Sequence, residues 1–145
     1  MALSLEVLSA HYREYASQPD SWVQNMEATK ESIFGRVISR TFQPTSGAEI
    51  KVVVLGASDK RYVDIHQRIF DRLVGRPVKM CTFDIDIEHL RGAGRLTQHD
   101  VTKQFPDPPY DIVVSHALMK FLTHDEQVAV IRNSVEALRP GGVAM

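Results

Sequence analysis

Residues 50–74 constrain the fold most, because a short β-branched run, a small-residue turn and a helical pattern follow one another there. The run IKVVVLG is apolar after its lysine and ends at Gly56, as expected for a strand that is buried on both faces. Beyond the turn, apolar residues recur at helical spacing: Tyr62, Ile65, Ile69, Phe70 and Leu73. Gly75 and Pro77 then end that helix. This layout is typical of a nucleotide-binding loop in an α/β protein, although the turn has one glycine where such loops commonly have three.

The following residues repeat the alternation of strand and helix. Further strand candidates are VKMCTFDID, RLTQHDV and YDIVVSHALM, and a fifth strand begins within residues 143–145. Before that last strand, Thr123 and Glu126 form the capping-box signal of a helix. The apolar face of that helix is predicted to consist of Val128, Ile131, Val135 and Leu138. Alternating strands and helices predict a parallel sheet with right-handed crossovers, whose ligands bind at the carboxyl ends of the strands.

Residues 1–47 depart from this alternation and are predicted to form an amino-terminal helical segment. Its first apolar stripe consists of Leu5, Leu8, Tyr12 and Tyr15, and its second of Val23, Met26, Ile33, Val37 and Ile38. We expect the aromatic residues of this segment, Tyr12, Tyr15 and Trp22, in the core rather than over a ligand. The connector QPTSG separates the segment from the sheet-forming residues 48–145.

Composition argues against several classes of function. The net charge is −1, from 17 basic and 18 acidic residues, and no long basic run is present, so we do not expect a nucleic-acid partner. No apolar run approaches the roughly 18 residues that cross a bilayer, and we expect no membrane partner. The single cysteine, Cys81, cannot form an internal disulfide, which favours a reducing, cytoplasmic setting. The six histidines are scattered without paired spacing, so we predict no metal site.

Four segments occur in the order found in one family: VVVLGAS, TFDID, QHDVTKQFPDPPYDIVVSHALMKFL and ALRPGGVAM. From residue 50 to its end the chain resembles the class I S-adenosylmethionine-dependent methyltransferases. The resemblance implies an α/β fold, a Rossmann-like three-layer sandwich with a mostly parallel sheet that is incomplete at its carboxyl end. Residues 48–145 would form a partial cofactor-binding domain, and the preceding amino-terminal helices, residues 1–47, would act as a cap or lid. It implies S-adenosylmethionine as cofactor and a methyltransferase, or the cofactor-binding portion of one, with a small-molecule acceptor favoured. The alternative is a non-catalytic interaction module of the same fold, and the LRPGG ending argues against a nicotinamide dinucleotide site.

The resemblance also assigns roles to residues that follow the strands. Gly56, Ala57 and Ser58 would form the turn that lets backbone N–H groups approach the cofactor. Asp84, followed by Ile85, would accept the ribose hydroxyls, with Asp86 as the alternative acid. Asp100 would accept from the adenine amino group, and Val101 would donate its backbone N–H to the ring. Ser115 would lie beside the cofactor where the fourth strand ends.

Some positions depart from the family or remain open. Val54 stands where the family has an acid that helps to hold the amino-acid portion of the cofactor. Asp59 either compensates for that loss or caps the next helix. Asp111 is interpreted as structural, and His116 either faces a substrate or is a polar residue at the strand end. Because methyl transfer from an activated sulfonium needs mainly positioning, we name no catalytic residue.

The family's sheet has seven strands, and this sequence ends where the fifth begins. We therefore expect a truncated sheet in which the fourth strand lies at or near an edge with unpaired backbone groups. Three explanations are open: the chain is a fragment of a longer protein, it pairs with a copy of itself or with another protein, or the amino-terminal helices cover the gap. We favour a truncated chain that forms a homodimer.

Overall fold

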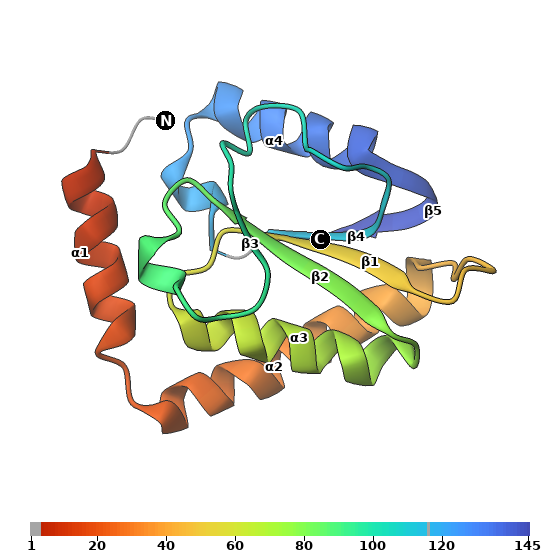
Figure 1. Ribbon diagram of the computed structural model, residues 1–145, viewed down its shortest axis with the longest axis horizontal. Helices are drawn as coiled ribbons and strands as arrows, with labels where there is room; N and C mark the ends of the chain where they lie inside the picture. Colours follow the sequence, from red (N-terminus) through yellow and green to blue (C-terminus); the bar gives the residue numbers. More distant parts are fainter. Residues whose placement is uncertain (1–3, 116) are drawn as a thin grey trace.

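The computed structural model describes residues 4–115 and 117–145, in which helices and strands alternate as predicted (Figure 1). The elements, with η for 3-10 helices, are α1 (Leu5–Ala16), α2 (Asp20–Thr41), β1 (Ile50–Leu55), α3 (Lys60–Val74), β2 (Val78–Asp84), η1 (Glu88–Leu90), β3 (Leu96–Gln98), β4 (Tyr110–Ser115), η2 (Met119–Phe121), α4 (His124–Ala137) and β5 (Leu138–Ala144). The capping box of Thr123 and Glu126 is present at the start of α4, as predicted.

The strands form one sheet in the order β3-β2-β1-β4-β5, and each neighbouring pair is parallel. Val52 of β1 lies opposite Met80 of β2 on one side and Ile112 of β4 on the other. Because β1 is the central strand, its apolar side chains are shielded on both faces, which explains the continuous β-branched run in the sequence.

The two faces of β1 belong to two different cores. Val52 and Val54 pack with residues of α2 and α3, whereas Val53 and Leu55 pack with residues of α4. Figure 1 shows the same arrangement, with α2 and α3 on one face of the sheet and α4 on the other. The predicted three-layer α/β sandwich is therefore confirmed.

Helix α3 is held at both ends, at its carboxyl end as the sequence predicts. Asp59 caps its amino end by accepting a hydrogen bond from the Arg61 backbone N–H, and Gly75 ends it in the left-handed conformation with φ 60°. Tyr62, Ile69 and their neighbours on the predicted face are buried against the sheet.

Helix α2 packs against α3. The face of α2 that is buried in this contact differs slightly from the predicted one. Ile33 was expected in the apolar stripe but is 48% exposed, whereas Phe34 is 8% exposed. The Phe34 ring stacks on Phe70 of α3, with ring centroids 5.7 Å apart. Because adjacent residues of a helix point about 100° apart, this stacking turns Ile33 toward solvent.

The predicted inner face of α4 is wrong. The helix buries Val130, Ser134 and Ala137, and it leaves Val128, Ile131 and Val135 exposed at 41%, 56% and 61%. Small side chains at 134 and 137 let α4 approach the sheet closely, so the larger β-branched residues form a second, outward stripe. Leu138, which was assigned to the same helical face, begins β5 instead.

The expectation of unpaired backbone groups on the fourth strand also needs correction. Strand β5 starts directly after α4 and pairs with β4 through a bulge between Tyr110 and Ile112. The backbone of Met145 continues this pairing by donating to Val113 and accepting from Ser115. Strand β4 therefore has a partner on both sides, and β5 is the edge strand.

Candidate functional site

The polar residues that follow β1, β2 and β3 meet at one end of the sheet. Because the strands are parallel, their carboxyl ends lie at the same edge. One pocket there is lined by seven of the predicted site residues: Gly56, Ala57, Ser58, Asp84, Ile85, Asp100 and Val101. Apolar and aromatic side chains complete its wall, among them Phe83, Leu118 and Phe121.

The eighth predicted site residue, Ser115, does not line this pocket. Ser115 lies on the α4 side of the sheet and lines a neighbouring hollow with Leu55, Val113 and Met145. It shares this side with Val113, because alternate residues of a strand point to the same face. His116 lies outside the described residues.

The turn after β1 is fastened to the end of β2. Gly56 has φ 78°, a conformation that favours glycine, and its N–H donates to the Phe83 carbonyl over 2.7 Å. The Ala57 N–H donates to Oδ2 of Asp84 over 3.0 Å. The backbone of the turn and the acid of β2 are therefore joined by hydrogen bonds at one corner of the pocket.

Asp84 is a buried carboxyl group at the centre of this corner, with 7% of its surface exposed. Its Oδ1 accepts 3.3 Å hydrogen bonds from the Asp86 N–H and from the Tyr12 hydroxyl. Burial raises the pKa of Asp84, against the opposing effect of the N–H groups of Ala57 and Asp86. Asp86, the alternative acid, instead accepts from the Glu88 N–H at the start of η1 and is absent from the pocket wall.

Asp100 lines the pocket and also stabilises its own loop. Its Oδ1 accepts from the Thr102 N–H at 3.0 Å and from the Thr102 hydroxyl at 2.7 Å. Burial opposes the charged form, but these two bonds outweigh it and the pKa of Asp100 lies below its ordinary value. A carboxylate that is kept ionised in this way is a suitable acceptor for an amino group.

Two positions where the sequence departs from the family have structural roles. Val54 is fully buried between β2 and β4, in the core shared with α2 and α3. Asp59 caps α3 and accepts from the Arg61 guanidinium at 2.7 Å, which is the second of the two roles considered for it. Asp111, as predicted, is structural, because its carboxylate accepts from the Lys51 N–H and from Arg139.

Helix α1 contributes residues that were not predicted to belong to the site. Leu8, His11 and Tyr12 line the pocket, and His11 Nε2 lies 2.9 Å from Ser58 Oγ. The Tyr12 ring stacks on His89, with centroids 3.6 Å apart, and His89 Nε2 lies 2.7 Å from the Ala57 carbonyl oxygen. The available signal was helical spacing, since residues 8, 11, 12 and 15 fall on one face.

With α1 in place, the pocket is almost filled. Its cavity volume is about 40 Å³, whereas pockets that hold small-molecule ligands commonly measure roughly 300 Å³ or more. A nucleoside-sized ligand therefore requires part of the pocket wall to move, and α1 with its side chains forms one part of that wall.

Neither a metal-binding cluster nor a membrane-spanning helix is found in the described residues. Within them, no group of three or more His, Cys, Asp or Glu side chains is arranged to hold a metal ion. Likewise, none of the helices in residues 4–115 and 117–145 combines the length and apolar character that a membrane span requires.

Comparisons with known proteins agree on the fold. No protein-family model matches the sequence, and no curated protein matches it. Among solved structures, DesVI of Streptomyces venezuelae is 21% identical with a TM-score of 0.56, and the match covers 81% of this chain and 49% of that one. A TehB-like SAM-dependent methyltransferase from Corynebacterium glutamicum is 23% identical with a TM-score of 0.58, covering 94% and 71%. The complex of DhpI with SAM and HEP is 22% identical with a TM-score of 0.61, covering 97% and 61%.

These likenesses confirm the fold that the sequence resemblance implies, the Rossmann-like fold of S-adenosylmethionine-dependent methyltransferases. The chain spans about half to seven tenths of the length of these three structures.

Proposed function

We propose that this chain binds S-adenosylmethionine in the pocket at the ends of β1, β2 and β3, as a methyltransferase or as the cofactor-binding portion of one. The observation that supports it most is the convergence of the Gly56 turn, Asp84 and Asp100 on one pocket of a methyltransferase-like fold. The acceptor that we favour is a small molecule, as the resemblance in sequence implies. The free thiol of Cys81 agrees with the cytoplasmic setting that we propose.

The residues of the pocket fit the parts of a nucleoside. Asp84 Oδ1 faces the Tyr12 hydroxyl, so it is placed to accept from a ribose hydroxyl in the same position. Asp100 would accept from the adenine amino group, and Val101 would donate its N–H to the ring. The turn of residues 56–58, at the amino end of α3, would lie against the amino-acid portion, where the positive end of a helix favours a carboxylate. The N–H groups of Gly56 and Ala57 already donate to Phe83 and Asp84.

Bound S-adenosylmethionine would supply a sulfonium-activated methyl group. The protein's part would be to exclude water with Leu8, Leu118 and Phe121 and to hold the acceptor in line. Such positioning needs no catalytic acid or base, and we assign none.

A non-catalytic module of the same fold is the second candidate. Two observations favour it: Val54 replaces the acid that would hold the amino-acid portion, and the cavity with α1 in place measures about 40 Å³. This candidate predicts a folded protein that binds neither S-adenosylmethionine nor its demethylated product.

Calorimetry separates the two candidates. Titration with S-adenosylmethionine, S-adenosylhomocysteine and NAD should show binding of the first two and none of NAD. Asp84→Ala should weaken binding by about 1–3 kcal/mol, because a buried hydrogen bond to a charged group is lost. Asp86→Ala is the matched control and should bind as the wild type does. If the folded wild-type protein binds neither S-adenosylmethionine nor S-adenosylhomocysteine, the first candidate is wrong and the non-catalytic module is favoured.

The partner that we propose is a second copy of the chain at the open edge of the sheet. Strand β5 is the edge strand of the sheet, and the exposed residues Val128, Ile131 and Val135 of α4 lie on the face beside it. A two-fold axis at β5 would pair the β5 strands of two copies. The exposed stripe of α4 in one copy would then be covered by the same stripe in the other copy.

A further inference from the structure

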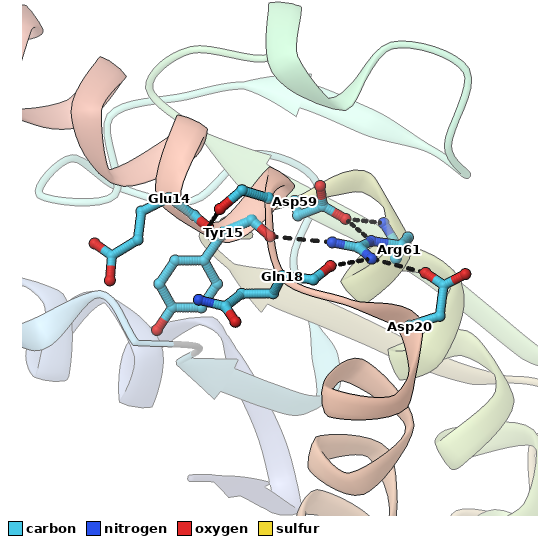
Figure 2. Close-up of polar contacts among 7 residues, drawn as sticks. Glu14, Tyr15, Gln18, Asp20, Asp59 and Arg61 are labelled. Carbon is cyan, nitrogen blue, oxygen red and sulfur yellow. Dashed lines mark hydrogen bonds and ion pairs between the residues drawn. The ribbon is translucent and has the colours of Figure 1, made fainter.

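Arg61 joins the turn of the pocket to the end of α1. It lies in the first turn of α3, and its guanidinium makes four hydrogen bonds within 3.0 Å, drawn in Figure 2. Nε donates to Asp59, and Nη2 donates to the carbonyl oxygen of Tyr15. Nη1 donates to the carbonyl oxygen of Gln18 and to the carboxylate of Asp20.

Two of these acceptors are carbonyl groups where α1 ends. The last carbonyls of a helix have no partner within the helix, and a cation near them is also favoured by the helix dipole. Arg61 therefore caps α1 from another element of the fold. Its planar fork reaches three parts of the chain at once, which a lysine ammonium on a single stem cannot reproduce.

Helix α1 is thus fixed at its carboxyl end and reaches over the pocket from there. About one turn before Tyr15, His11 contacts Ser58 and Tyr12 contacts Asp84. The orientation of these two side chains consequently depends on where the end of α1 is held. Because Asp59 both caps α3 and binds Arg61, this attachment begins immediately after the Gly56 turn.

We propose that Arg61 is a positioning residue that keeps α1 across the pocket and so limits how fast a nucleoside-sized ligand enters and leaves. The choice of ligand, S-adenosylhomocysteine, rests on the proposed function. The attachment of α1 by Arg61 does not depend on it. If α1 is a gate, loosening it accelerates both association and dissociation, because both pass through the same movement.

The chain offers a matched control on the same helix. Arg72 of α3 also binds across to another helix, with hydrogen bonds of 2.7 Å to Glu31 and 2.9 Å to Glu27 of α2. It contacts neither α1 nor the pocket, so Arg72→Met removes a comparable attachment without touching the end of α1.

The first measurement needs no ligand. Hydrogen exchange of the α1 amides should be about tenfold faster in Arg61→Met than in the wild type, since charged hydrogen bonds of this kind hold the helix. Arg72→Met should leave α1 exchange unchanged. Wild-type exchange rates in α1 of Arg61→Met would overturn the proposal.

The second measurement is stopped-flow binding of S-adenosylhomocysteine. We expect both rate constants to rise in Arg61→Met by about tenfold and to stay at wild-type values in Arg72→Met. Arg61→Lys keeps the charge but loses the fork, so it should resemble Arg61→Met, and it serves as the test if Arg61→Met does not fold. Unchanged rates, or a change in dissociation alone, would refute the gating role.

The two proposals fail in different ways. If the folded wild type binds no S-adenosylhomocysteine, the proposed function is wrong, and α1 exchange still decides the attachment. If the wild type binds but Arg61→Met leaves both rates unchanged, the cofactor proposal stands and the role of Arg61 as a gate is wrong.

Discussion

The hydroxyl group of Tyr12, on α1, donates a 3.3 Å hydrogen bond to Oδ1 of Asp84 at the end of β2. Burial raises the pKa of Tyr12, and the nearby charge of Asp84 raises it further, so the hydroxyl remains a donor at neutral pH. The bond places a protein group on the same oxygen that we propose for a ribose hydroxyl. Tyr12 and the nucleoside would therefore compete for Asp84.

Tyr12→Phe tests this competition, because it removes the hydroxyl and keeps the ring that stacks on His89. We expect S-adenosylhomocysteine to bind about fivefold more tightly, corresponding to about 1 kcal/mol for one hydrogen bond, in calorimetric titration. Tyr15→Phe is the control, since Tyr15 lies on the same helix but packs beside Trp22 and Tyr62. Weaker binding by Tyr12→Phe would mean that the hydroxyl supports the ligand instead of competing with it.

The frame of the pocket could be predicted from the sequence because local patterns determine it. The run that ends at Gly56 requires a buried strand and a turn, and parallel strands bring Asp84 and Asp100 to the same edge. The role of Tyr12 could not be predicted in this way. Its contact with Asp84 joins residues 72 positions apart, and no pattern within α1 indicates which side chain meets it.

The rotation of α4 shows a second limit. Two stripes of the helix were available to face the sheet, and hydrophobicity alone favoured the one with Ile131 and Val135. The structure buries the stripe with Ser134 and Ala137, because small residues allow closer packing on β4 and β5. Apolar periodicity predicted the helix but not which of its faces would be covered.

Arg139→Met should destabilise the protein strongly. Arg139 of β5 binds the carboxylate of Asp111, which also accepts from the Lys51 N–H over 2.7 Å, and both charged side chains are largely buried. Removing the cation leaves a buried carboxylate without its partner, at a cost of about 3–5 kcal/mol. Urea unfolding monitored by circular dichroism measures this loss.

Arg91→Met is the control for Arg139→Met. Arg91 pairs with Glu88 at 2.7 Å, but both side chains are exposed. An exposed pair contributes about 0–1 kcal/mol, so the free energy of unfolding should barely change. Equal effects of the two substitutions would show that Asp111 does not depend on Arg139.

His66 should make the protein sensitive to mild acid. Burial between α2 and α3 lowers the pKa of His66 to about 3 in the folded state, from 6.5 in the unfolded chain, and the charge of Lys30 contributes to the decrease. Between these two values the unfolded chain binds the proton that the folded protein excludes, so stability falls as the pH falls from about 6.5 toward 3. From pH 7 to pH 5 the contribution of His66 to the free energy of unfolding should decrease by about 2 kcal/mol.

His66→Gln removes this titration, and its free energy of unfolding should depend less on pH over the same range. The exposed His124 provides the control His124→Gln, which should retain the wild-type slope. Urea midpoints at pH 7, 6 and 5 compare the three proteins. A wild-type slope in His66→Gln would assign the acid sensitivity to other groups.

Self-association through the edge of the sheet can be tested on the exposed stripe of α4. If β5 and α4 form the interface, the wild type sediments as a dimer, and Ile131→Lys places a charge in the buried apolar surface and shifts the protein to monomer. Ile33→Lys alters a similarly exposed isoleucine on α2, on the opposite face of the sheet, and should leave the dimer intact. Sedimentation velocity at several concentrations distinguishes these outcomes. A monomeric wild type would contradict the proposed homodimer. A dimer that survives Ile131→Lys but not Ile33→Lys would place the interface on α2.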